Sequence, residues 1–452
     1  MSAATATSLR IDRSRLLARI DELAQIGALP VEGGEGGSSR LALTDADGAG
    51  RDLVTSWMAD LGLRVDIDGV GNVVGTWPAD RFDPPVMTGS HIDTVATGGR
   101  YDGNLGVLAG LEVVETVIEA STTGDLVLDR PLAVGFFTNE EGSRFAPDML
   151  GSLVYVGGLP LEEALDTVAI DGAVLGDELA RIGYVGGMPC PARPPAAFVE
   201  LHIEQGPVLE SEGVTIGAVT GVQGISWQEL TISGQSNHAG TTPIELRHDA
   251  AHVAAAVVVA VRRLADETPG LVGTVGRIEL HPDLINVVAA RATITVDLRH
   301  THEPTLARAE SRLAAEVAEL ADAEGVDVAW RRLARFDPVD FDPMVVDLVE
   351  EVATAHRRTV RRMPSGAGHD AQMLARVCPA GMIFTPSVDG ISHNPTERTE
   401  PDDIEAGANV LLDVILRLAT LPDATLRGAR PDPGAEPRKL EQFDEIIEGG
   451  GS

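Results

Sequence analysis

The segment PVMTGSHIDTVATGGRYDGNLGVLAGLEVV, residues 85–114, decides the fold class of this chain. Its first part, Pro85–Ser90, is a short apolar run and predicts a buried strand. His91 and Asp93 follow that strand, and Gly106–Ala120 predicts an apolar helix. A buried strand that leads through polar residues into a helix is typical of an α/β domain, in which sites form at the carboxyl ends of the strands.

The same alternation of strands and helices extends on both sides of this segment. Upstream, Ile11–Ile26 and Thr44–Leu61 have the spacing of helices, the second beginning at a Thr/Asp cap. Downstream, Pro131–Thr138, Ala197–Ile203 and Ala380–Pro386 predict further buried strands. The sequence therefore predicts an α/β fold with a mainly parallel sheet and helices on both faces.

The pattern changes between residues 217 and 330. Trp227–Gly234 and Ala292–Arg299 alternate like half-buried strands, and His248–Glu267 and Pro304–Glu324 predict long helices. Two strands and two helices would form a small α+β domain inserted into the first one. We therefore expect a catalytic domain over 1–216 and 331–421, an inserted domain over 217–330 and a flexible tail over 422–452, where Pro, Gly and Glu are frequent.

The composition excludes several classes of partner. A net charge of −34 argues against nucleic acid and against anionic membranes. The first thirty residues lack the apolar core of a signal peptide, and the longest apolar run, Ala250–Val261, is too short to span a bilayer. Cys190 and Cys378 have no metal-like spacing and are expected to be reduced thiols. We expect a cytoplasmic protein.

Four of the predicted strands each deliver an imidazole or a carboxylate to one rim. His91 follows the first, Glu140-Glu141 the second, His202 ends the third and His393 lies in the loop after the fourth. Imidazoles and carboxylates are the ligands of zinc and similar divalent ions. In a site with two metal ions, one glutamate of the doublet could ligate while its neighbour acts as general base.

Each of these signals has a more ordinary explanation when taken alone. A lone His-x-Asp pair is usually a surface feature, and a glutamate doublet often begins a solvated helix. A histidine in an apolar strand, such as His202, is more often a satisfied buried residue than a ligand. Their joint placement after successive strands favours a metal site, in which Asp93 could accept the other ring N–H of His91.

Longer motifs connect these positions. They are GSHIDTVATGGRYDGNLGVLAGLE at 89–112, TNEEGSRF at 138–145, ELHIEQGPVLE at 200–210, GQSNHAGTTP at 234–243, INVVAARATITVDLRH at 285–300, SGAGHDAQ at 365–372 and GISHNPTE at 390–397. In this order they resemble the M20 metallopeptidase-like amidohydrolases of the hydantoinase/carbamoylase branch. That branch includes N-carbamoyl-L-amino-acid hydrolases, allantoate amidohydrolases and β-ureidopropionases.

The resemblance implies a di-zinc peptidase-like catalytic domain with two divalent ions, zinc by default and manganese, cobalt or nickel as alternatives. One ion would be held by His91 and His202, the other by Glu141 and His393, with Asp102 between them. Glu140 would be the general base. The wording HIEQGP around His202 favours the carbamoylase branch, because peptidases of the wider family usually carry a carboxylate there.

The resemblance also implies that the inserted domain is a lid through which the protein forms homodimers. His238, Asn286 and Arg299 match substrate-binding positions, and His238 would reach the partner's active site. Arg299 lies on the polar side of its predicted strand, where a guanidinium could bind a substrate carboxylate bidentately. His238 could donate a hydrogen bond to an oxyanion. Without the resemblance, both would be interpreted as solvated residues.

Two further segments are expected to contact the substrate. Gln205 would contact either the substrate or the metal site, and the loop Gly366, Ala367, Gly368 would offer backbone amides, with His369 a weaker candidate. The remaining histidines match no role and are interpreted as surface or structural residues: His248, His252, His281, His300, His302 and His356.

The function implied is hydrolysis of the carbamoyl C–N bond of N-carbamoyl-L-amino acids or a related ureido acid, with release of ammonia and carbon dioxide. An allantoate amidohydrolase is the alternative of the same class. A dipeptidase or aminoacylase of the wider family is a second alternative, which His202 disfavours. A metal-free binding scaffold is the non-enzymatic alternative, and metal analysis of the purified protein distinguishes it.

Overall fold

The computed structural model describes residues 9–32, 34, 36–122, 126, 128–422, 426 and the backbone of 446–447. The chain divides into two compact units, which are described separately: unit 1 comprises Met1–Gly221 and Asp340–Lys439, and unit 2 comprises Val222–Val339 and Leu440–Ser452. The boundary expected after residue 330 falls within a strand of unit 2, β12 (Asp327–Phe336). The tail expected over 422–452 lies outside the described residues, apart from 422, 426 and the backbone of 446–447.

The centre of unit 1 is a set of four parallel strands. They lie in the order β15 (Ala380–Thr385), β7 (Ala197–Ile203), β5 (Val86–His91) and β6 (Leu132–Phe137). Every residue of these four strands is buried. Parallel strands covered on both faces have continuous apolar sequences, which is why these four could be recognised from the sequence.

Further strands extend the sheet of unit 1 on both sides. β4 (Val73–Trp77) and β3 (Arg64–Ile67) follow β6, and β8 (Ile216–Val222) follows β15, with β13 (Val339–Asp340) and β14 (Val360–Ser365) both paired to β8. The pairs β4/β6, β3/β4 and β8/β15 are antiparallel, so the sheet as a whole is mixed. The expectation of a mainly parallel sheet therefore describes its centre. The flanking strands were not predicted, because several are short or only partly buried.

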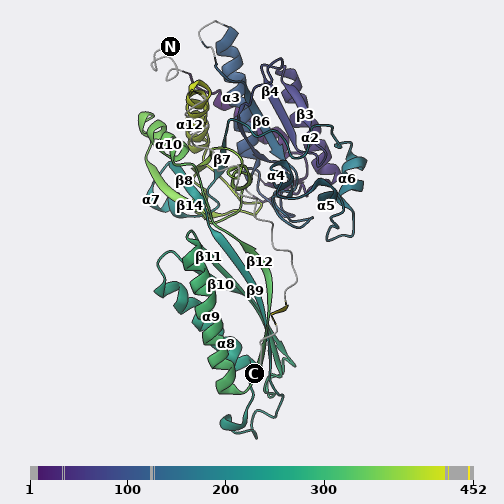
Figure 1. Ribbon diagram of the computed structural model, residues 1–452, viewed down its shortest axis with the longest axis vertical. Coiled ribbons are helices and arrows are strands. Elements are labelled where there is room, and N and C mark those ends of the chain that lie inside the picture. The colour runs from purple at the N-terminus through teal and green to yellow at the C-terminus, as the bar shows by residue number, and fades with distance from the viewer. Residues whose placement is uncertain are drawn as a thin grey trace. The chain divides into compact units, whose positions relative to one another are not determined.

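Helices cover both faces of this sheet (Figure 1). α3 (Asn104–Thr122) and α12 (Pro401–Thr420) pack on β5 and β7, and α11 (Asp370–Leu374) also contacts β7. Successive residues of β7 point to opposite faces. Leu201 packs against α12, while the carboxylate of Glu200 accepts a hydrogen bond of 2.9 Å from the first turn of α11. α12 and α11 therefore lie on opposite faces of the sheet.

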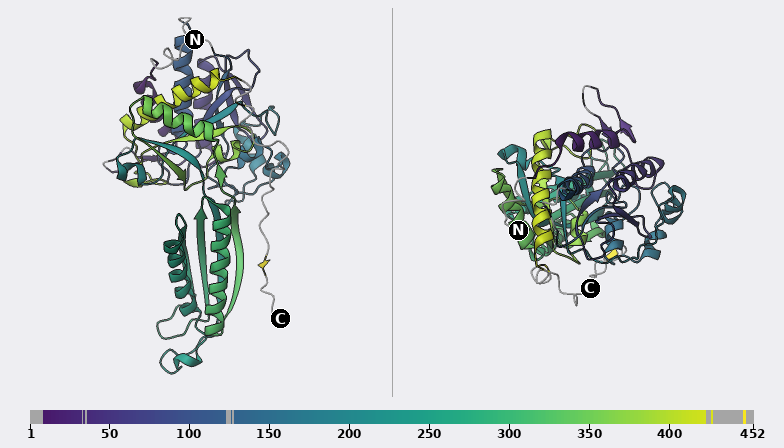
Figure 2. Two further views of the ribbon diagram at one scale, coloured as in Figure 1. Left: turned by 60° about the vertical axis from the view of Figure 1, so that its left-hand side comes forward. Right: turned by 90° about the horizontal axis from the view of Figure 1, so that it is seen from above.

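The other helices of unit 1 complete these layers. They are α1 (Arg13–Ala24), α2 (Asp45–Asp60), α4 (Leu150–Tyr155), α5 (Leu161–Leu165), α6 (Leu175–Ile182), α7 (Val208–Glu212) and α10 (Pro343–Ala355). α2 begins as predicted at Thr44, whose hydroxyl accepts the N–H of Asp47. Figure 2 shows α10 and α12 packed side by side. In the described part of the chain, no helix combines the length and apolar character needed to cross a membrane.

Unit 2 contains a single antiparallel sheet in the order β10-β11-β9-β12-β16. The prediction of two strands was correct for β9 (Gly224–Ser233) and β11 (Arg291–His300), but β10 (Val272–His281) and β12 were missed. β10 is an edge strand whose residues are mostly exposed, and β12 carries three arginines. Neither strand shows the apolar alternation that identifies a half-buried strand. β16 (Ile446–Ile447) pairs with β12.

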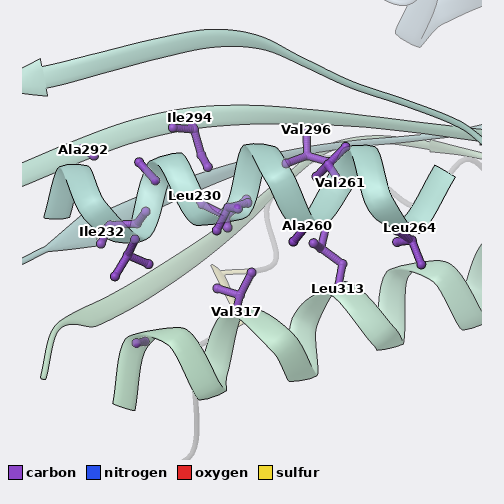
Figure 3. Packing of buried hydrophobic residues seen from close by; sticks show 14 of the residues in the cluster. Leu230, Ile232, Ala260, Val261, Leu264, Ala292, Ile294, Val296, Leu313 and Val317 are labelled. Atoms are coloured by element: carbon purple, nitrogen blue, oxygen red, sulfur yellow. The ribbon is translucent and has the colours of Figure 1, made fainter. Parts of the chain in front are cut away.

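The core of unit 2 lies between this sheet and the helices α8 (Ala250–Glu267) and α9 (Glu303–Glu324). Figure 3 shows Leu313 and Val317 of α9 directed toward residues of α8 and of the sheet, such as Ile294. Alternate residues of β11 are buried, as its sequence predicted. The apolar run Ala250–Val261 therefore belongs to a core helix of a small α+β unit.

Candidate metal centre

The predicted ligands of unit 1 converge at the carboxyl ends of its parallel strands. His91 is the last residue of β5, Glu140-Glu141 follow β6, and His202 is next to the last residue of β7. His393 lies in the loop after β15, and Asp102 lies two residues before α3. All five positions come together around the carboxylate of Asp102.

The first group of donor atoms consists of His91, His202 and Asp102. The Oδ1 atom of Asp102 lies 3.2 Å from Nε2 of His202 and 3.7 Å from Nε2 of His91. The three donor atoms lie within 4.8 Å of one another. All three side chains are buried, so the group is held in position by its surroundings.

The second group uses the other oxygen of the same aspartate. Nε2 of His393 lies 3.3 Å from Oδ2 of Asp102 and 3.2 Å from Oε2 of Glu141. Each oxygen of Asp102 thus serves one group of donors. This is the arrangement expected of a carboxylate that bridges two divalent ions.

The histidine rings are oriented as metal ligation requires. Nδ1 of His91 lies 2.9 Å from the carbonyl oxygen of Asp93, and Nδ1 of His202 lies 2.8 Å from the carbonyl oxygen of Ile203. Donation of Nδ1–H to a carbonyl leaves Nε2 as the electron-pair donor, directed at Asp102. The residues present therefore fit a pair of divalent cations.

Asp93 acts differently from the prediction. We expected its carboxylate to accept the ring N–H of His91, but its backbone carbonyl does so. The carboxylate instead accepts the backbone N–H groups of Glu140 at 3.3 Å and Glu141 at 3.4 Å. Asp93 therefore positions the doublet through its side chain and the ring of His91 through its backbone carbonyl.

Glu140 lies beside the two donor groups without being a member of either, among the described residues. Its Oε2 atom is 3.4 Å from Nε2 of His91. Burial, followed by the nearby carboxylates of Asp370 and Glu141, raises the pKa of Glu140 well above its ordinary value. A carboxylate with a raised pKa at this place can accept and return a proton.

In the metal-free protein, two of the ligand histidines hold protons strongly and the shared aspartate is held in its charged form. Hydrogen bonds to Asp102 and Glu141 raise the pKa of His393 to about 11. Burial is the strongest single influence on His202 and lowers its pKa, but the hydrogen bond and charge of Asp102, the charge of Glu200 and the carbonyl of Ile203 together outweigh it and raise the pKa to about 9. Burial likewise opposes ionisation of Asp102, yet these two imidazoles hold its pKa well below the usual range. The cluster thus attracts positive charge.

Gln205 and the 366–368 loop lie at this site with partners of their own. Nε2 of Gln205 donates to Oδ2 of Asp102 at 2.9 Å, which places it on the metal site, while its buried Oε1 has no protein partner among the described residues. The amide of Ala367 donates to Oγ of Ser365 at 3.1 Å. That amide is therefore engaged within the loop, and contact of Gly366, Ala367 and Gly368 with the substrate stays a prediction.

The three candidates of the inserted domain lie at two ends of the unit 2 sheet. His238 pairs with Val287, and the carbonyl of Asn286 accepts the N–H of Ala239 at 2.9 Å, so His238 and Asn286 are neighbours. Both residues are exposed. They lie beyond the end of β11 that begins at Arg291, whereas Arg299 lies near the other end.

Arg299 already has partners within unit 2. Its guanidinium forms an ion pair of 2.9 Å with Asp297 and lies 5.9 Å from the ring centre of Trp227. Eight residues separate it from Arg291 along β11, or about 26 Å at about 3.3 Å per residue. Unit 2 therefore does not bring Arg299 together with His238 and Asn286.

Several residues around the site were missed or underrated by the sequence analysis. Glu200 accepts a hydrogen bond of 2.6 Å from Ser90, and the ring of His369 lies 4.6 Å from that of His202. Asp370 is fully buried, and burial followed by the nearby carboxylate of Glu200 raises its pKa well above the ordinary value. His369 had been a weaker candidate, and Glu200 also had a usable signal, because it lies two residues before His202 in a strand and so shares its face.

Comparison with known proteins agrees with this geometry. The model of "Peptidase family M20/M25/M40" matches residues 87–417. An N-carbamoyl-L-amino-acid amidohydrolase of Rhizobium meliloti is 40% identical over 421 residues, which are 93% of this chain and 99% of that protein. An allantoate amidohydrolase of Bacillus subtilis is 34% identical over 88% of this chain and 96% of that protein.

A solved structure extends the likeness to the whole fold. The amidase of the hydantoinase/carbamoylase family from Burkholderia multivorans is 46% identical and matches with a TM-score of 0.86, covering 92% of this chain and all of that one. The family expected from the sequence motifs is confirmed. The chain is a hydrolase of peptidase family M20/M25/M40, in its hydantoinase/carbamoylase branch.

Proposed function

We propose that this protein is a metal-dependent amidohydrolase that cleaves the carbamoyl C–N bond of an N-carbamoyl-L-amino acid or a related ureido acid. One observation carries the proposal: two groups of donor atoms share the carboxylate of Asp102, and Glu140 lies beside them as a member of neither group. The family relationship adds the reaction class, since the R. meliloti relative is named for N-carbamoyl-L-amino acids.

The donor set favours two divalent ions, with zinc as the first choice because nitrogen and carboxylate ligands suit it. His91 and His202 would hold one ion, Glu141 and His393 the other, with Asp102 shared. When bound, such a pair of ions polarises the carbamoyl carbonyl group and acidifies a water molecule. Manganese, cobalt and nickel are alternatives that metal analysis would distinguish.

The residues of unit 1 then move protons. Glu140 accepts a proton from the attacking water as the C–O bond forms, and then delivers that proton to the departing nitrogen as the C–N bond breaks. The carboxylate of Asp93 holds Glu140 in place by accepting the backbone N–H of Glu140 at 3.3 Å. The products are the amino compound and carbamic acid, which decomposes to ammonia and carbon dioxide.

The residues of unit 2 are assigned to substrate binding. Arg299 would bind the substrate carboxylate, sharing its guanidinium with Asp297. His238 and Asn286 would donate hydrogen bonds to the oxyanion that forms on the carbamoyl group. In unit 1, the unpaired Oε1 of Gln205 is an acceptor for an N–H of the ureido group.

The distance within unit 2 supports a homodimer formed through this lid unit. Arg299 lies about 26 Å from the end of β11 next to His238 and Asn286, which exceeds the length of a carbamoyl amino acid. One substrate therefore cannot contact both ends of the same unit 2. We propose that a second copy of the chain supplies His238 and Asn286 to each site.

A heterodimer experiment tests this arrangement. Chains with Glu140→Gln and His238→Ala are co-expressed with different tags, and the mixed dimer is purified. It should regain about half the wild-type activity, because one of its two sites has every residue. The mixed dimer of Glu140→Gln and Arg299→Ala is the control and should not exceed the Arg299→Ala parent. Equal recovery in both pairs, or in neither, would remove the proposed exchange.

Allantoate is the second candidate substrate, because the B. subtilis relative is named for it. A panel of N-carbamoyl-L-amino acids, N-carbamoyl-β-alanine and allantoate, assayed for ammonia release with and without added metal, separates the candidates. Turnover of dipeptides above all ureido acids would contradict the proposal. Nucleic-acid and membrane partners are not expected at a net charge of −34, and a cytoplasmic location stays a prediction from the sequence.

A further inference from the structure

Glu397 is a buried carboxylate next to the candidate metal centre and, among the described residues, belongs to neither group of donor atoms. Only 3% of its surface is exposed, and it lies four residues after His393. One of its oxygens, Oε1, accepts the backbone N–H groups of Tyr101 and Asp102, each at 3.1 Å. These are the peptide groups that immediately precede and carry the shared aspartate.

The second oxygen of Glu397 connects the same aspartate to the loop of His393. Oγ of Ser392 lies 2.9 Å from Oε2 of Glu397 and 3.0 Å from Oδ2 of Asp102. Ser392 directly precedes His393. The Ser392 hydroxyl has one proton and lies within hydrogen-bond distance of both carboxylates, so it connects Glu397, which accepts the backbone N–H of Asp102, to the side chain of Asp102.

The packing around Glu397 leaves little freedom for this set of bonds. A Cβ atom at Gly99 would overlap the Glu397 carboxylate, so the chain leading to Asp102 passes directly against it. Burial of a carboxylate is costly unless hydrogen bonds compensate it. The hydrogen bonds from Tyr101, Asp102 and Ser392 offset part of that cost, and as charge-assisted bonds they constrain the local geometry.

We infer that Glu397 is a positioning residue that fixes the Asp102 carboxylate between the two groups of metal ligands and holds it in register with His393. The inference rests on the metal site of the proposed function. Hydrogen-bond partners of metal ligands typically contribute about 10–100-fold to metal affinity. Glu397 acts on the ligand that both groups share, so its loss should weaken the binding of both ions.

Two substitutions at this position separate hydrogen bonding from charge. In Glu397→Gln, the amide oxygen can still accept both backbone N–H groups, and the amide N–H can donate to Ser392, which then donates to Asp102. In Glu397→Ala the hydrogen bonds from Tyr101, Asp102 and Ser392 to residue 397 are lost, and Ser392 keeps only Asp102 as a partner. Ser392→Ala removes only the connection between the two carboxylates. Glu400→Ala is the matched control, because Glu400 is a half-exposed carboxylate on the same segment that pairs with Arg398.

The measurement is the Kd of the metal-stripped full chain for Zn²⁺, by competition with a chromophoric chelator, with a thermal unfolding curve for each variant. We expect Glu397→Ala to bind about 10–100-fold more weakly and Ser392→Ala about 3–10-fold more weakly. Glu397→Gln and Glu400→Ala should stay within about threefold of wild type. The order should persist among variants whose unfolding temperatures match.

The results distinguish this inference from the proposed function. Wild-type affinity in both Glu397→Ala and Ser392→Ala would overturn the positioning role while leaving the metal site intact. Equal losses in Glu397→Gln and Glu397→Ala would also overturn it, since charge rather than hydrogen bonding would then matter. If the wild-type chain bound no ion, the proposed function itself would fail.

Discussion

The two units of this protein use polar residues in opposite ways. In unit 1, charged and imidazole side chains converge in the interior: the exposed fractions of His91, Asp102 and His202 are 1%, 3% and 1%. In unit 2, the core consists of apolar residues, and the candidates His238 and Asn286 are exposed. A buried cluster can form a preorganised metal site within its own unit, whereas exposed residues need a ligand or a partner to complete a site.

The difference is also one of energy. Burial of so many carboxylates in unit 1 is unfavourable unless protons or cations compensate them, and the histidines with raised pKa values carry out that role in the metal-free protein. The core cluster of unit 2 consists of apolar residues, so no buried charge has to be compensated within it. We therefore expect changes in unit 1 to alter metal binding and chemistry, and changes in unit 2 to alter substrate binding or the stability of that unit.

The largest expected effect separates the two glutamates of the doublet. Glu140→Gln should lower kcat by about 10²–10⁴-fold with an unchanged metal content, because the general base is lost and the ligands remain. Glu141→Gln should instead weaken metal binding, since Glu141 belongs to the second donor group. Steady-state kinetics and metal analysis of both variants check this. Retention of activity by Glu140→Gln would remove it as the base.

A core substitution in unit 2 tests whether the units are energetically separate. Leu313 is 1% exposed and packs in the core between α8, α9 and the sheet. Leu313→Ala should lower the free energy of unfolding of unit 2 by about 2–5 kcal/mol, because contacts are lost and a cavity is left behind. Zinc affinity of the metal-stripped protein should stay the same. A weaker zinc affinity in Leu313→Ala would show that the two units are not energetically separate.

Arg299 tests the role assigned to the exposed residues of unit 2. Arg299→Ala should lower kcat/KM for a carboxylate substrate by about 10–100-fold, because a charge-assisted bidentate hydrogen bond is lost, with little effect on metal content. Arg299→Lys should retain part of the wild-type kcat/KM. A substrate whose carboxylate is converted to an amide should be poor for the wild type and insensitive to the substitution. Equal use of acid and amide would contradict the assignment.

The last prediction concerns the dependence of metal binding on pH. The pKa values of His202, about 9, and of His393, about 11, are raised above the ordinary value for histidine. Both rings are therefore doubly protonated and positively charged at pH 7 in the metal-free protein. Ligation requires neutral rings, so protons compete with the metal below these pKa values. Affinity should therefore rise with pH between about 6 and 8, by up to about tenfold per pH unit for each proton released.

A pH indicator in weak buffer measures this release directly. We expect about two protons per chain on metal binding at pH 7. The variant His393→Gln should release about one proton fewer. Metal binding without proton release would show that the imidazoles are already neutral, and the contrast in charge between the two units would then be smaller than described.

Much of unit 1 could be predicted from the sequence. The strands β5, β6, β7 and β15 are buried on both faces, so their residues form continuous apolar runs that end at the ligands. Because the carboxyl ends of parallel strands meet at one edge of the sheet, convergence of the ligands followed from the order of strands and polar residues.

The remainder depended on contacts that have no local pattern. β10 lies at the edge of its sheet and β12 is rich in arginine, so neither shows the alternation of a half-buried strand. Glu397 contacts Asp102, 295 residues away in the sequence. The spacing of His91 and Asp93 likewise suggested a carboxylate contact, but only the folded loop shows that the carbonyl of Asp93 makes it.

The most direct test of the central claim is ammonia release by the purified full chain before and after removal of its metal. A chelator should abolish ammonia release from the preferred N-carbamoyl-L-amino acid or allantoate, and addition of a divalent ion should restore it as about two ions per chain are bound. Ammonia release that survives complete removal of metal, or full activity with fewer than one ion per chain, would contradict the shared two-metal site around Asp102.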